Sequence, residues 1–223
     1  FRNVAPEFGM DKALHSMSVG VTDINLDGYP DVYISNIATL VKDNKYTFPD
    51  VNTPLDFDLF AMSGMLIKEA DTFFVSEAEG GEFSGYVLSD DVERGATSTG
   101  WAWDAEFLDF DHDGDDDLYL VNGTNDYNAF SMIARNGQEG EAAAALLLSH
   151  SREANVFFRN EQGKLKNRSP ESGANFVGNS RSTAFFDFDQ DGDLDIYVSN
   201  YRLVANSLWQ NDGEGPFTDG GGP

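Results

Sequence analysis

The chain has 223 residues, of which 39 are Asp or Glu and 14 are Lys or Arg, so its formal net charge at pH 7 is −25. Such a charge argues against nucleic acids and anionic membrane surfaces as partners. There is no cysteine, so disulfide frameworks and thiolate metal sites are excluded. The sequence also lacks a run of 18 consecutive apolar residues, and we therefore expect no insertion into a membrane.

A nine-residue acidic motif occurs three times along the chain. Its first copy begins at Asp23 and reads DINLDGYPD, and further copies begin at Asp109 and Asp187, 86 and then 78 residues later. All three follow the pattern D-x-D/N-x-D-G-x-x-D, and each leads directly into an apolar segment typical of a β-strand. Recurrence at this spacing predicts a repeat protein with three units.

These motifs have the composition of calcium-binding loops. A calcium ion takes roughly 6–8 oxygen ligands, and side chains at the first, third, fifth and ninth positions of a tight loop can converge on one ion. The sixth residue is always glycine, which allows the sharp turn, and the carbonyl of the seventh residue is expected to add a ligand. The predicted ligands of three Ca²⁺ sites are Asp23, Asn25, Asp27, Tyr29 and Asp31; Asp109, Asp111, Asp113, Asp115 and Asp117; and Asp187, Asp189, Asp191, Asp193 and Asp195.

The EF-hand is the nearest alternative, since it opens with the same residues but ends on a bidentate Glu at position 12 between two helices. The twelfth positions here are Ile34, Leu120 and Val198. None of these side chains can bind a metal, and all three lie in strand-like runs, so the EF-hand is excluded. The remaining alternative is a set of three acidic surface turns that hold no ion.

A second landmark in each unit is a pair of short strands joined by a turn that contains glycine. We expect these hairpins at 73–83, 156–165 and 207–217. The strands that enter the acidic loops are expected at 18–22, 101–108 and 182–186. With the strand after each loop, every unit then contains four strands.

The predicted units differ mainly in the length of one connection. Insertions at 37–71 and 123–155 contain helix-forming stretches, and the sequence leaves their role open. We expect the first unit at about 1–84, the second at about 85–166 and the third at about 167–219.

Tandem four-stranded antiparallel units predict an all-β chain of β-propeller blades. The loops resemble the FG-GAP/VCBS calcium-binding repeat of integrin α-subunit propellers and many bacterial secreted proteins. The string GWAWDAEFLDFDHDGDDDLYLVNG, followed by NVFFRNEQGKL, is closest in look to the subgroup named after ASPIC/UnbV and cartilage acidic protein. The resemblance implies the first, third, fifth and ninth loop residues as metal ligands, in agreement with the spacing. Asn25 and Pro30 depart from the pattern, so the first loop is expected to bind more weakly.

The number of predicted blades is unusual. Closed propellers commonly have about 4–8 blades, and three blades leave strand edges that can pair with another chain. Residues 1–4 match the end of a hairpin that has no first strand in the sequence. We therefore expect the chain to be part of a larger propeller, or to complete one by associating with other chains.

Metal binding and blade packing account for every strongly patterned residue. We therefore expect a calcium-stabilised, non-catalytic module for protein interaction, adhesion or assembly, secreted or at the cell surface, with the periplasm as an alternative compartment. Its expected partner is a protein, or a second copy of the chain bound through open blade edges.

Two other functions stay open as hypotheses. A carbohydrate-binding, lectin-like propeller that binds glycans is suggested by 18 Phe, 8 Tyr and 3 Trp, although blade packing explains most of these rings, Trp101 and Trp103 included. A hydrolase has the least support. The three histidines are isolated in the sequence, and a carboxylate pair such as Asp104 and Glu106 is expected by chance among 39 acids.

Overall fold

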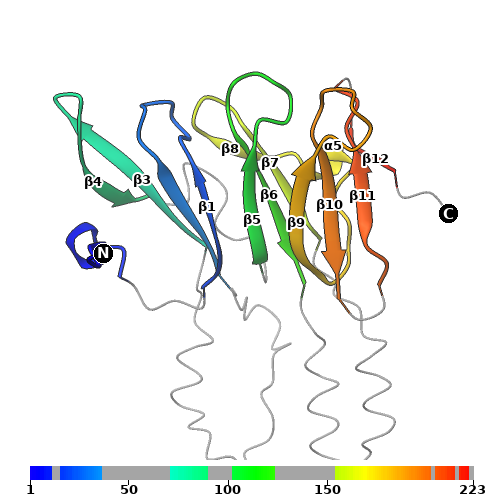
Figure 1. The fold of residues 1–223 in the computed structure, drawn as a ribbon, viewed down its shortest axis with the longest axis horizontal. Coiled ribbons are helices and arrows are strands. Elements are labelled where there is room, and N and C mark those ends of the chain that lie inside the picture. Colours follow the sequence, from blue (N-terminus) through cyan, green and yellow to red (C-terminus); the bar gives the residue numbers. More distant parts are fainter. Residues whose placement is uncertain are drawn as a thin grey trace, which may run out of the picture.

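The computed structural model describes residues 1–11, 16–36, 71–89, 102–123, 154–201, 204–213 and 216–220. In these ranges, β-strands form three four-stranded antiparallel sheets that follow one another along the chain (Figure 1). This arrangement confirms the prediction of an all-β chain with four strands in each of three units, as in propeller blades. The helix-forming stretches of the two insertions lie outside the described residues.

The strands of each sheet are hydrogen-bonded in chain order. The first sheet contains β1 (Ser16–Thr22), β2 (Asp31–Asn36), β3 (Thr72–Glu79) and β4 (Glu82–Leu88). The second contains β5 (Ala102–Leu108), β6 (Asp117–Asn122), β7 (Val156–Asn160) and β8 (Leu165–Asn167). The third contains β9 (Ser180–Phe186), β10 (Asp195–Asn200), β11 (Ser207–Gln210) and β12 (Thr218–Asp219). Short helical turns occur at η1 (Ala5–Phe8) and α5 (Ser169–Ser172).

The three sheets repeat the same register. In each, a tyrosine of the second strand lies opposite an apolar residue of the third strand: Tyr33 pairs with Phe73, Tyr119 with Phe157, and Tyr197 with Leu208. An acidic loop joins the first two strands of every sheet, and a tight turn joins the last two strands of the first and second sheets; these connections lie along the upper edge in Figure 1. The register therefore brings all three acidic loops to one side of the molecule.

The first and second sheets pack through an apolar core. The ring of Phe107 on β5 lies with its centroid 6.1 Å from that of Tyr33 and 6.2 Å from that of Phe73. Gly20 allows β1 to approach β5, because a Cβ at this position would stand 2.9 Å from the carbonyl oxygen of Ala105. A side chain at Gly20 would therefore push the two sheets apart.

A second core joins the second and third sheets. It contains Leu108, Tyr119, Ile196 and Val198 among its buried residues. The hydroxyl of Tyr119 donates a 2.8 Å hydrogen bond to the carbonyl of Ala174, in the segment that leads into β9. The buried tyrosine thus ties its own sheet to the start of the next one.

The outer faces of the first and third sheets remain partly uncovered and apolar. Tyr33 and Tyr119 are fully buried, whereas Tyr197, at the same register position of the third sheet, is 37% exposed. On β1, Val19 and Val21 are 57% and 58% exposed. The same positions that are buried between sheets are therefore accessible at the two outer faces.

A further sequence repeat relates the first residues of the chain to a segment near residue 170. Residues 1–10 (FRNVAPEFGM) match residues 165–174 (LKNRSPESGA), and both contain a short helical turn with proline near its start. Each turn ends on a glycine in the left-handed region, Gly9 at φ 67° and Gly173 at φ 77°. The described ranges contain no helix with the length and apolar character that a membrane span requires.

Candidate metal centres in the acidic loops

The first Asp of each loop organises the loop backbone. Oδ1 of Asp23 accepts the N–H of Asp27 at 2.9 Å, and Oδ2 accepts the N–H of Gly28 at 2.7 Å. Asp109 and Asp187 make the same pair of hydrogen bonds to the fifth and sixth residues of their loops. These bonds replace the backbone partners that a tight loop cannot supply itself.

The fourth and sixth residues bend every loop. The glycines have φ values of 91°, 91° and 104°, as the sequence predicts for a sharp turn, and they are Gly28, Gly114 and Gly192. The fourth residues are also left-handed, with φ of 55° to 65° at Leu26, His112 and Gln190. This conformation is unfavourable for residues other than glycine, and the motif gave no sign of it because the fourth position varies.

The ninth Asp lies at the base of its loop, where the second strand begins. All three are buried, at 0%, 1% and 0% exposure for Asp31, Asp117 and Asp195. One oxygen of each accepts a backbone N–H from the third strand or the residue that follows it, at 2.7 to 2.9 Å. In the first and third loops the other oxygen accepts the N–H of the second loop residue.

The second loop differs because two of its buried carboxylate oxygens have no hydrogen-bond partner. These are Oδ1 of Asp111 and Oδ2 of Asp117. Burial raises the pKa of Asp117 to about 7, with Asp111 and Asp113 adding to the rise, and burial also raises the pKa of Asp111. A buried acceptor without a donor is costly, and a hard cation with oxygen ligands would satisfy both groups.

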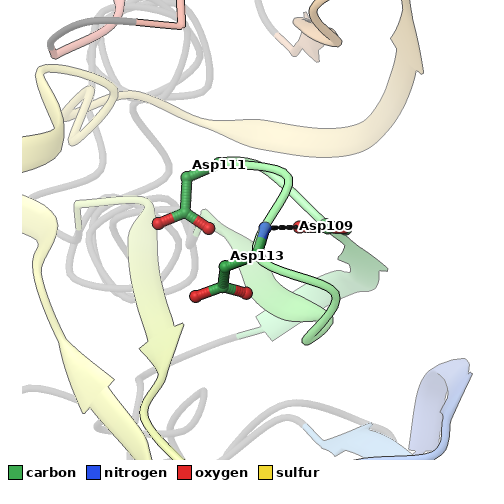
Figure 2. A group of neighbouring side chains, drawn as sticks. All are labelled: Asp109, Asp111 and Asp113. Atoms are coloured by element: carbon green, nitrogen blue, oxygen red, sulfur yellow. Dashed lines mark hydrogen bonds between the residues drawn. The ribbon is translucent and has the colours of Figure 1, made fainter.

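Carboxylates converge in two of the loops. In the second loop, three carboxylate oxygens lie within 4.8 Å of one another, one each from Asp109, Asp111 and Asp113. Figure 2 shows the carboxylates of Asp111 and Asp113 side by side. In the third loop the corresponding group is Asp187, Asp189 and Asp195. Two ligands about 2.4 Å from a calcium ion lie at most about 5 Å apart, so both groups fit a single ion.

The first loop is arranged differently. Asn25 takes the third position, and its amide donates to Oδ2 of Asp27 at 3.1 Å. The hydroxyl of Ser76 lies 3.4 Å from the carbonyl oxygen of Tyr29 and donates to Asp31 at 2.9 Å. Among the described residues, the first loop does not bring three carboxylates together. Its weaker calcium binding stays a prediction.

Among the remaining predicted ligands, Asp191 lies outside the converging group of the third loop. The others are the seventh residues of the second and third loops, Asp115 and Asp193. The N–H of each donates to the fifth residue of its loop at 3.0 Å. The carboxylate of Asp193 also lies 2.9 Å from Nε2 of His112, so the second and third loops touch. The ligand role of their carbonyls stays a prediction.

The third strand brings a different side chain to each loop. Ser76, Asn160 and Asn211 donate their backbone N–H to the ninth Asp of their sheets. The residue before each of them is Val75 in the first sheet, Arg159 in the second and Gln210 in the third. Arg159 forms ion pairs with Asp111 and, at 3.4 Å, with Asp113. The amide of Gln210 donates to Asp189 at 2.5 Å. The sequence motif contains neither residue.

Two asparagines link neighbouring sheets beside the loops. Asn160 donates from Nδ2 to the carbonyl of Ile24 in the first loop at 3.3 Å and accepts the N–H of Gly163 in its own turn at 2.8 Å. Asn211 repeats both bonds, to Phe110 at 3.2 Å and to Gly213 at 3.0 Å. In the sequence, the strings FRN (158–160) and WQN (209–211) place these asparagines at equivalent positions of the second and third units, and this was the signal for their shared role.

Of the other candidates from the sequence, Trp101 lies outside the described residues, whereas Trp103 and Asp104 occupy packing positions. Trp103 lies under the guanidinium of Arg181, 4.2 Å from its ring centroid, and bonds the carbonyl of Gly123. Asp104 accepts the N–H of Thr183 at 3.0 Å and so joins β5 to β9. Burial, together with the nearby Asp104, raises the pKa of Glu106.

The loops, sheets and turns together define a repeated four-stranded antiparallel unit with one acidic loop, consistent with propeller blades. Residues 143–198 match the model of the FG-GAP-like repeat, so the chain contains a repeat of this family, as the motif predicted. The match includes β9, the whole third loop and the first part of β10. The closer subgroup stays a prediction. A comparison with curated proteins found no match.

Proposed function

We propose that the chain is a calcium-stabilised, non-catalytic propeller module that acts in protein interaction outside the cell. The observation that supports this most is the second loop, where two buried carboxylate oxygens lack a donor beside a cluster of acids that fits one ion. The FG-GAP-like repeat supports an extracellular interaction role. Structural positions of Trp103 and Asp104 support a scaffold and give no indication of a catalytic centre.

Calcium in these loops would act on stability. An ion that binds only the folded form adds RT ln(1 + [L]/Kd), on the order of 1–2 kcal/mol per site for extracellular modules at millimolar calcium. For a chain of this size the melting temperature should then fall by about 2–8 °C per occupied loop when EGTA removes calcium. Magnesium in place of calcium serves as the control. An unchanged melting temperature in EGTA would contradict the calcium role.

The interaction surfaces we propose are the outer faces of the first and third sheets. Val21 in β1 is equivalent to Phe107 in β5, and Phe107 packs against the first sheet. Tyr197 in β10 is equivalent to Tyr33 and Tyr119, which are buried. These two faces carry apolar or aromatic residues at the positions that pack together inside the chain. A second copy of the chain, joined face to face in the same way, is therefore the proposed occupant.

The mass of the native particle tests this part of the proposal. We expect an oligomer in calcium and a monomer for the paired substitutions Val19→Glu and Val21→Glu. Val177→Glu, at a 56% exposed position before β9, is the matched control and should leave the mass unchanged. A monomer in calcium would exclude the second copy and direct the search to a different protein partner.

A further inference from the structure

We propose that Arg159 is a built-in counter-ion of the second loop, which competes with calcium for Asp111 and Asp113 and makes this loop bind the ion more weakly than the third loop. The inference rests on the proposed calcium role. It concerns a strand residue outside the nine-residue motif, and it predicts that three similar loops differ in affinity.

The contacts of Arg159 place its charge at the cation position. The guanidinium pairs with Asp111 and lies 3.4 Å from Oδ2 of Asp113, and both carboxylates belong to the group that converges within 4.8 Å. A calcium ion held by these oxygens would lie close to the guanidinium, and like charges at such short range repel strongly in a partly buried site. Binding therefore requires Arg159 to withdraw.

The second loop is nevertheless built for an ion. Oδ2 of Asp117, on a residue only 1% exposed, has no hydrogen-bond partner, and the same holds for the buried Oδ1 of Asp111. Arg159 thus leaves two acceptors of the second loop unsatisfied. It compensates for part of the negative charge when calcium is scarce without completing the coordination that an ion provides.

The third loop provides an internal comparison. Gln210 holds the position of Arg159, because Phe158 and Trp209, the residues before them, pair with equivalent residues of β6 and β10. Its neutral amide touches Asp189 at 2.5 Å. An amide is a hydrogen-bond donor without net charge, so it repels a bound cation far less. The two loops differ at this position by one full charge.

Reciprocal substitutions test the inference in the full chain. Calcium chloride is titrated while the backbone amides of Gly114 and Gly192 are followed by NMR, since each donates to the first Asp of its own loop. We expect the Kd at Gly114 to fall roughly ten-fold in Arg159→Gln and the Kd at Gly192 to rise by a similar factor in Gln210→Arg. The double exchange keeps the net charge and should reverse the order of the two loops.

Arg159→Lys is the matched control, because it keeps the charge and changes the shape. Its Kd at Gly114 should stay within about three-fold of that of the unchanged protein. Dispersed amide signals in EGTA establish that each variant is folded.

The inference is overturned if Arg159→Gln leaves the titration at Gly114 unchanged, or if Gly114 fails to respond to calcium in that variant. Calcium binding at Gly192 would then still support the proposed function. If calcium moves the amides of no loop in any variant, the proposed function fails as well.

Discussion

The second and third acidic loops have the same backbone but receive different partners from their third strands. The second loop meets the positive charge of Arg159 and retains a buried oxygen of Asp117 without a donor. The third meets the neutral Gln210, and both oxygens of Asp195 accept backbone hydrogen bonds. The nine-residue motif therefore determines the conformation of a loop, whereas its charge balance depends on a strand elsewhere in the sequence.

The largest expected difference between the two loops concerns the ninth Asp. Asp195→Ala leaves the buried N–H of Asn211 and the partly buried N–H of Phe188 without an acceptor, and should lower the free energy of unfolding by about 3–5 kcal/mol. Asp117→Ala deprives only Asn160 of its acceptor and removes a buried carboxylate, so its loss should be about 1–2 kcal/mol. Urea unfolding in EGTA measures both.

Glu79→Ala, at the exposed end of β3, is the control for this pair and should change stability by less than about 0.5 kcal/mol. Equal losses in Asp195→Ala and Asp117→Ala would contradict the difference in hydrogen bonding on which the comparison rests.

A second prediction uses the pKa of Asp117, raised by burial from 3.8 to about 7. Between these values the calcium-free folded protein binds more protons than the unfolded chain, so this group stabilises the fold below pH 4 and the contribution is lost as pH rises through 7. The unfolding free energy of the unchanged protein should fall relative to that of Asp117→Asn by roughly 4 kcal/mol, at about 1.4 kcal/mol for each pH unit between the two pKa values.

Asparagine is a close control because its carbonyl oxygen can still accept the N–H of Asn160. Urea unfolding in EGTA at a series of pH values gives the two curves. Parallel curves between pH 4 and 7 would show that the Asp117 carboxyl does not titrate in this range.

The smallest effect is expected where the two loops touch. Nε2 of His112 lies 2.9 Å from Oδ1 of Asp193, with the side chains 54% and 19% exposed. Contacts at exposed positions contribute little, so His112→Asn should change the unfolding free energy by at most about 0.5 kcal/mol. A loss above about 1.5 kcal/mol in urea unfolding would mean that the loops are coupled more tightly than this contact allows.

Much of the fold could be predicted from the sequence because each unit carries local signals. The acidic motif with its glycine located the turn between the first two strands, and glycine-containing turns between aromatic and β-branched runs located the hairpins. Even the buried Asp31, Asp117 and Asp195 were singled out, although as ligands alone. Their second task, accepting backbone hydrogen bonds from the third strand, depends on pairing across the sheet.

The rest could not be predicted because it depends on contacts between distant segments. Arg159 has no mark in the sequence that distinguishes it from a solvated strand residue, and only the sheet register brings it to Asp111. The repeat between residues 1–10 and 165–174 was within reach, since PE and G recur at matching positions. A pattern of strands joined by tight turns does not reveal it, because its turn is helical.

The asparagines beside the loops give the array a direction. Asn160 and Asn211 each secure a turn of their own sheet and the loop of the sheet before it, so every such loop is supported from one side by its successor. In a stack with nearest-neighbour coupling, an ion bound in one sheet would make the following sheet harder to detach. Because such coupling is reciprocal, loss of the following sheet would in turn weaken the ion site of the sheet before it.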